Sequence, residues 1–164
     1  MSKWIIFKGF HISTFLPKFY FLNKREEIEE TYKITFNESC KYRINEKSCV
    51  NKLFGYCFGL FQVHKNSVRF GWTYSEENDK VIIWIYTYQE SKLNKFKIYE
   101  CEISDKEYEF SIKTSIKRQE AFFYINGSEV HKTNVNIYSK IIPTLGFYFG
   151  GKTRAPHKIK IDYK

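Results

Sequence analysis

The chain has 164 residues, and its 27 Lys and Arg outnumber its 18 Asp and Glu, for a formal net charge of +9. A chain of this length fits one domain that buries roughly two-thirds of its unfolded surface, so it needs no disulfide or metal to hold its fold. Aromatic residues make up 20% of the sequence, which favours strands over helices and indicates an all-β domain.

The positive charge suggests an anionic partner, but the residues that carry it restrict which one. Only five of the basic residues are Arg, and the 22 Lys are scattered without a basic run. Sequence-specific recognition of nucleic acid relies on the guanidinium fork of Arg, so we expect no sequence-specific nucleic-acid partner. The abundance of Lys, Asn, Ile, Phe and Tyr with scarce Ala also matches the codon bias of an AT-rich genome.

Targeting and metal signals are missing from the sequence. Lys3, Lys8 and His11 interrupt the apolar N-terminal stretch, which has no small-residue cleavage site, so no signal peptide is predicted. No apolar run approaches the ~18 residues of a membrane-spanning helix. We therefore expect no membrane span and a cytoplasmic or virion-associated protein. The four cysteines lack ligand spacing, which predicts reduced thiols, no metal and no cofactor.

Short period-two segments separated by polar turns run through the whole chain. In order, we expect strands over residues 4–10, 18–22, 28–36, 40–44, 53–61, 67–74, 81–88, 95–103, 107–116, 120–125, 135–138, 145–149 and 157–163. Residues 24–30 are rich in helix formers, but a helix there has one apolar side chain to bury, so a strand is preferred. Many short strands with frequent turns are typical of an antiparallel sandwich or barrel with little helix.

Two local signals add detail to this pattern. Asn126-Gly127 predicts a tight hairpin turn, because both residues tolerate a positive φ. Gly55 and Gly59 lie on one face of their predicted strand, which indicates a bulge, a bend or a close backbone neighbour.

The strand over residues 81–88 is the centre of the predicted fold because both of its faces are apolar. Ile83 and Ile85 lie on the face that we assign to the core. Trp84, Tyr86 and Tyr88 alternate with them, and we expect the two tyrosines to be partly exposed on a concave surface. Trp72, on the preceding strand, is expected in the core.

The order of these motifs resembles the concanavalin A-like, laminin G-like jelly roll over residues 50–164. The motifs that carry the resemblance are Arg69-Phe70-Gly71-Trp72, residues 81–88, residues 108–112, residues 123–127, residues 145–151 and residues 155–161. The chain is also similar to small uncharacterised proteins of Bacteroidetes bacteria and their phages, in residues 51–55, 64–67 and 155–157. The resemblance implies a single β-sandwich domain over residues 1–164, with the jelly-roll core in residues 51–164 and N-terminal strands in residues 1–50. This fold includes lectins, carbohydrate-binding modules, hydrolases and lyases, so it implies ligand binding on the concave sheet.

Catalytic patterns are weak by comparison. A jelly-roll glucanase needs paired carboxylates on one strand face, and the nearest acids, Glu102, Asp105 and Glu107, lie across a predicted turn. A jelly-roll alginate lyase uses a Gln-x-His, a Tyr and an Arg, which residues 62–64, Tyr148 and either Arg43 or Arg69 resemble. The Arg-Ser/Thr-Glu-Leu-Arg block of those lyases is missing.

Ligand binding without catalysis is therefore the preferred function. The candidate ligand-binding residues are Trp84, Tyr86, Tyr88, Arg69, His64 and Tyr148, with Lys97 as a further cation; we assign no catalytic residue. We predict a module that recognises a glycan or another anionic or polyhydroxylated ligand. The alternatives are a phage or virion-associated protein that docks to another protein and, less favoured, a polysaccharide lyase.

Overall fold

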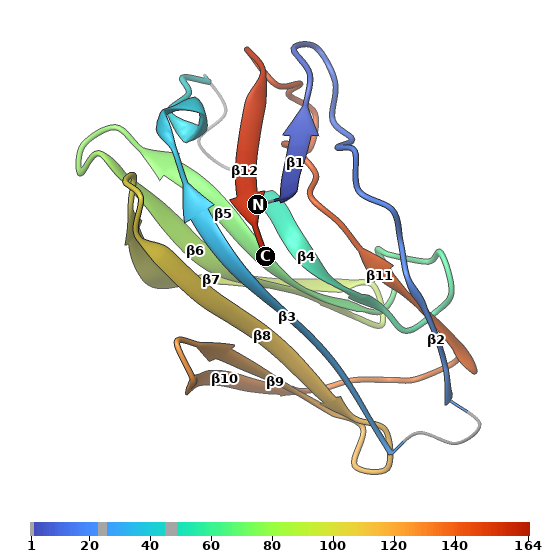
Figure 1. Cartoon of the computed structure of the whole chain (residues 1–164). Helices are drawn as coiled ribbons and strands as arrows, with labels where there is room; N and C mark the ends of the chain where they lie inside the picture. Colours follow the sequence, from blue (N-terminus) through green and yellow to red (C-terminus); the bar gives the residue numbers. More distant parts are fainter. Residues whose placement is uncertain (1, 23–25, 45–48) are drawn as a thin grey trace.

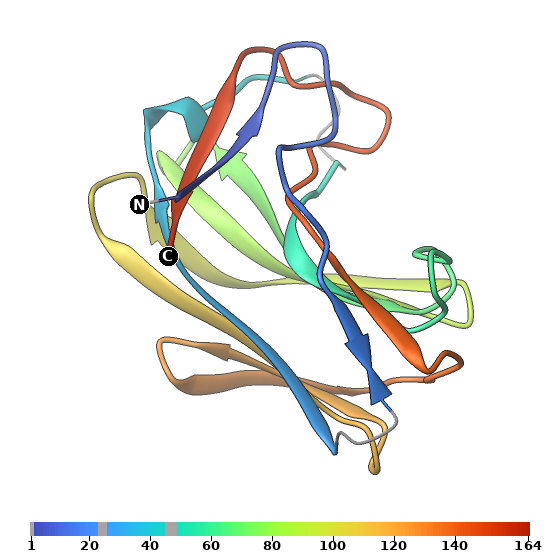
Figure 2. The same cartoon turned by 45° about the vertical axis from the view of Figure 1, so that its right-hand side comes forward.

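The computed structural model describes residues 2–22, 26–44 and 49–164. Its strands form two antiparallel sheets of six strands that pack against each other, as Figure 1 and Figure 2 show from two directions. This arrangement confirms the predicted β-sandwich. Of the described residues, Glu38–Cys40 form a short 3-10 helix and none lies in an α-helix. No helix in this part of the chain is long and apolar enough to cross a membrane.

The strand order shows that neighbours in sequence are often neighbours in a sheet. The first sheet has the order β1-β12-β3-β8-β9-β10, with β1 at Ser2–Ile6, β12 at Ile159–Tyr163, β3 at Glu27–Phe36, β8 at Glu107–Ser115, β9 at Glu120–Ile125 and β10 at Ser128–Asn134. The second has the order β2-β11-β4-β5-β6-β7, with β2 at Phe19–Phe21, β11 at Ile141–Leu145, β4 at Asn51–Cys57, β5 at Ser67–Ser75, β6 at Lys80–Gln89 and β7 at Lys92–Glu102. The first and last strands lie in the first sheet, where β1 pairs with β12.

Three predicted strands are wrong in place or kind. The strand expected over residues 40–44 begins in the 3-10 helix, because the side chain of Asn37 accepts a hydrogen bond from the Ser39 amide and turns the chain. Residues 135–138 are not a strand, because the strand after β9 lies earlier in the chain. Asn126 and Gly127 adopt φ of 50° and 78°, and this tight turn sends the residues directly after it back along β9 as β10. The strand expected over residues 145–149 lies mostly earlier, as β11.

A helix is the alternative to a strand near residues 24–30, and the described part of this segment contains no helix. From Glu27 onward the chain is strand β3, paired with β8 along its length. Residues 24 and 25 lie outside the described residues. The strand wins because alternate side chains of β3 reach the core, whereas a helix there would bury very little.

The core is aromatic and lies between the two sheets. Phe70 of β5 contacts Phe110 and Phe123 of the first sheet edge-on, with ring centroids 5.3 and 5.1 Å apart. Trp72 is fully buried, as expected, and stacks on Phe147 at 5.8 Å. The inward side chains of β6 are the aliphatic set, so the predicted core face of this strand is confirmed.

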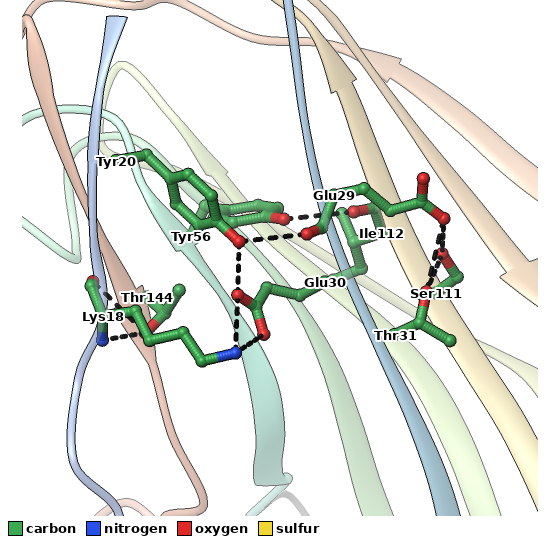
Figure 3. Close-up of polar contacts among 9 residues, drawn as sticks. All are labelled: Lys18, Tyr20, Glu29, Glu30, Thr31, Tyr56, Ser111, Ile112 and Thr144. Carbon is green, nitrogen blue, oxygen red and sulfur yellow. Dashed lines mark hydrogen bonds and ion pairs between the residues drawn. The ribbon is translucent and has the colours of Figure 1, made fainter.

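A buried carboxylate ties β2 of the second sheet to β3 of the first (Figure 3). Glu30 lies on the inward face of β3 between Ile28 and Tyr32, where the period-two pattern calls for an apolar residue. Lys18 Nζ lies 3.2 and 3.1 Å from its two oxygens, and the Tyr20 hydroxyl donates to Glu30 as well. These partners make the buried charge tolerable, because each carboxylate oxygen is hydrogen-bonded.

Replacement of Ile83 tests the assignment of its side of β6 to the core. Ile83 is fully buried, so Ile83→Ala should lower the free energy of unfolding by about 2–5 kcal/mol through lost burial and a new cavity. Leu16, which is 84% exposed, is the matched control, and Leu16→Ala should stay within about 0.5 kcal/mol of wild type. Equal urea midpoints for the two variants would contradict the assigned core face.

Candidate functional site

Strands β5 and β6 present a second face that points away from the core. Arg69 pairs with Tyr86 across the two strands, and Gly71 pairs with Trp84, so these residues share the outward face. A cavity of about 550 Å³ opens on this face. The loop after β4, the segment after β11 and part of the N-terminal segment form its other sides.

The structure brings five of the six predicted ligand-binding residues to this cavity. They are His64, Arg69, Tyr86, Tyr88 and Tyr148. Trp84 lies one position further along the outward face of β6 and lines a separate cavity with Thr73 and Lys97. The sequence reasoning missed Lys52, which also lines the first cavity.

Arg69 is a buried cation, and no described residue forms an ion pair with it. It is 7% exposed, and its Nε and Nη2 are buried without any hydrogen-bond partner in the part of the chain that the structure describes. Its guanidinium lies over the Tyr86 ring, 5.3 Å from the centroid. Burial lowers the pKa of Arg69, because the surroundings disfavour the charged form.

Gly55 lets Arg69 take this position. A Cβ on Gly55 would lie 1.9 Å from the Val68 carbonyl oxygen and 2.7 Å from Arg69 Cγ, so a side chain there would displace the arginine. The β4–β5 register also shifts between Lys52 and Gly55. Of the alternatives predicted from Gly55 and Gly59, a bulge and a close backbone neighbour are present at Gly55, whereas Gly59 lies after the end of β4.

Lys52 is the second buried cation of the cavity. Its Nζ donates to the backbone oxygens of Val50 at 2.7 Å and Gly150 at 3.2 Å, and it lies 4.6 Å from the Tyr86 ring centroid. Burial, followed by repulsion from the Arg69 charge, lowers the pKa of Lys52 to about 8. The nearest sequence signal is Gly55: the β4–β5 register shifts between Lys52 and this glycine, but the sequence pattern does not place the lysine in the cavity.

The two tyrosines of β6 differ from expectation in one respect. Tyr88 is half-buried, as expected, but Tyr86 is only 7% exposed, so the predicted partial exposure of Tyr86 is wrong. The reason is that Lys52 and Arg69 both cover its ring. Burial, with an interaction with the Tyr88 side chain, raises the pKa of Tyr86, which keeps its hydroxyl protonated as a donor.

Tyr148 and His64 complete the cavity from two different segments. The backbone of Tyr148 exchanges hydrogen bonds with Lys52, at 2.8 and 3.0 Å, and its ring stacks on His11 at 5.3 Å. His64 is exposed in the loop after β4, with its ring edge-on to Tyr88 at 5.2 Å. Gln62 lies outside the cavity lining, so residues 62–64 deliver one polar side chain to the site.

The arrangement suits an anion surrounded by hydroxyl-bearing groups. Two cations and three tyrosines line the cavity, and none of its described lining residues is Asp or Glu. The described residues contain no group of three His, Cys, Asp or Glu side chains placed to hold a metal. A buried guanidinium with unsatisfied N–H groups is costly unless a ligand supplies the acceptor.

Comparison with known proteins identifies the fold and no closer relationship. No family model matches the chain, and no curated protein sequence matches it. The structure is similar to alginate lyase vAL-1 from Chlorella virus, with a TM-score of 0.58 and 13% identity over 99% of this chain and 81% of that one. It is also similar to alginate lyase AlyC3, with a TM-score of 0.56 and 10% identity over 88% of this chain and 67% of the lyase.

A third neighbour has a different activity, so the likeness is one of fold. The endo-beta-1,3-glucanase from Pyrococcus furiosus aligns with a TM-score of 0.51 and 13% identity over 85% of this chain and 59% of the glucanase. The chain therefore has the concanavalin A-like jelly-roll fold. The narrower resemblance to proteins of Bacteroidetes and their phages, and the virion-associated role that it suggests, stay predictions.

The lowered pKa of Lys52 makes the free energy of unfolding depend on pH. Its pKa is about 8 in the folded chain against an ordinary value of 10.5, so between these pH values the unfolded chain binds more protons and rising pH favours folding. Wild type should therefore gain about 2 kcal/mol relative to Lys52→Met between pH 7 and pH 10, measured by urea unfolding. Lys158→Met, at an exposed lysine over Phe7, is the control and should run parallel to wild type. Parallel curves for wild type and Lys52→Met would contradict the burial of this amine.

Proposed function

We propose that the chain is a binding module for an acidic glycan, and that a sugar carboxylate enters the cavity between Arg69 and Lys52. The observation that carries this proposal is the pair of buried cations without a carboxylate among the described lining residues. The unpartnered Nε and Nη2 of Arg69 are suited to a carboxylate, whose two oxygens match the geometry of the guanidinium fork.

The tyrosines supply the sugar-binding part of the site. Tyr88 and Tyr148 offer rings that can stack on a pyranose face and hydroxyls that can bond its oxygens. His64 adds a polar group at the exposed rim. Neutral sugars alone would leave both cations without a counter-ion, so the acidic glycan is preferred over a neutral one.

Replacement of Arg69 tests the proposed ligand class. Wild type should bind trimannuronate or trigalacturonate in titration calorimetry, and Arg69→Gln should weaken binding at least about tenfold, because a charge-assisted hydrogen bond is lost. Arg118→Gln is the matched control, since Arg118 also lies over an aromatic ring, Phe122, but on the other sheet. Mannotriose, which is neutral, should bind neither wild type nor either of the two variants. Equal affinity for the neutral and acidic trimers would overturn the proposal.

A polysaccharide lyase is the second candidate, and one observation favours it. His64, Arg69 and Tyr148, which resemble the lyase residues, line one cavity. In that reaction a cation neutralises the uronate carboxylate and a base removes the C5 proton. A general acid protonates the leaving oxygen as the C4–O bond breaks, and the sugar keeps a C4–C5 double bond.

The lyase candidate has a direct spectroscopic test. Incubation with polymannuronate or polygalacturonate would produce an absorbance rise in the unsaturated-uronate band, lost in both His64→Ala and Tyr148→Phe. For the binding module we expect no rise with wild type at protein concentrations that saturate binding. A rise that the two variants abolish would replace the binding module by an enzyme.

A further inference from the structure

The outward face of β6 continues past the cavity in an ordered row. Across β5, β6 and β7, Arg69 aligns with Tyr86 and Lys95, and the next row aligns Gly71 with Trp84 and Lys97. Successive outward residues of one strand lie about 6.6 Å apart. Trp84 is therefore one step along the sheet from the proposed carboxylate site.

Trp84 faces a hollow of its own and is held in place. A second cavity of about 670 Å³ on this face is lined by Trp84, Thr73 and Lys97 among others. The Trp84 indole Nε1 donates to Thr73 Oγ1 at 2.9 Å, which fixes the orientation of the ring. A half-buried, oriented indole beside a hollow is suited to stack on a sugar.

The charges along the row favour a polyanion up to Trp84. Lys97 Nζ lies 5.6 Å from the Trp84 ring centroid, and no ion pair joins it to a carboxylate in the described chain. Lys95 lies close enough to Lys52 for its charge to lower the pKa of that lysine. Glu76 and Glu77, which follow the end of β5, also line the second cavity, so the positive charge of the face does not continue beyond it.

We propose that the ligand is a polyuronate chain that runs from the first cavity along β6, with one sugar stacked on Trp84 and a second carboxylate paired with Lys97. This inference rests on the proposed function and adds that the ligand is a chain of more than one uronate. Trp84 and Lys97 then favour a chain over a single sugar, while Arg69 and Lys52 favour an acidic sugar over a neutral one.

The experiment compares a single uronate with its trimer. Wild type should bind trimannuronate at least tenfold more tightly than mannuronate in titration calorimetry. Trp84→Ala and Lys97→Gln should each reduce that ratio below threefold while leaving mannuronate affinity within twofold of wild type. Lys106→Gln, at another exposed lysine over an aromatic ring, Tyr108, should keep the wild-type ratio.

The outcomes separate the two proposals. Equal affinity of wild type for mannuronate and its trimer, or an unchanged ratio in Lys97→Gln, would overturn the extended chain and leave the carboxylate site standing. No binding of either ligand by wild type would overturn both. Lys97 is exposed, so its variant tests the inference even if Trp84→Ala fails to fold.

Discussion

The antiparallel pairing of β5 with β6 is the contact on which both the core and the candidate site depend. The inward faces of the two strands contribute Phe70 and Ile83 to the sandwich, and their outward faces contribute Arg69 and Tyr86 to the cavity. Because strand side chains alternate, the same register fixes both sets at once. A slip of one residue would exchange core and site, so the packing of the core holds the binding residues in place.

The cavity departs from the rule that buried charges are paired. Glu30, buried between β2 and β3, shows the rule obeyed, with Lys18 and Tyr20 as partners (Figure 3). Arg69 and Lys52 are buried to a similar degree, yet both lie over the Tyr86 ring, and Lys52 donates to two backbone carbonyls in place of a carboxylate. Such local departures are concentrated at functional sites in proteins, which is why this cavity, and not Glu30, supports a ligand proposal.

The likeness to alginate lyases and to a glucanase with the same fold shows how little the fold itself restricts chemistry. The carboxylate pair that glycoside hydrolysis requires is missing from the described lining of this cavity. What the cavity contains is positive charge, tyrosine hydroxyls and one rim histidine. The character of the site therefore comes from its side chains, and the jelly roll supplies the curved sheet on which they are arranged.

Local sequence determined most of the strands, the Asn126-Gly127 hairpin and the two faces of β6, because alternation and turn chemistry act over a few neighbouring residues. It also selected six candidate ligand-binding residues, five of which line one cavity. Tertiary structure alone decided that Lys52 joins them and that Tyr86 is covered, since both follow from a register shift and from contacts between separate strands. It also placed Trp84 in a second hollow, because the walls of each cavity come from segments far apart in the chain.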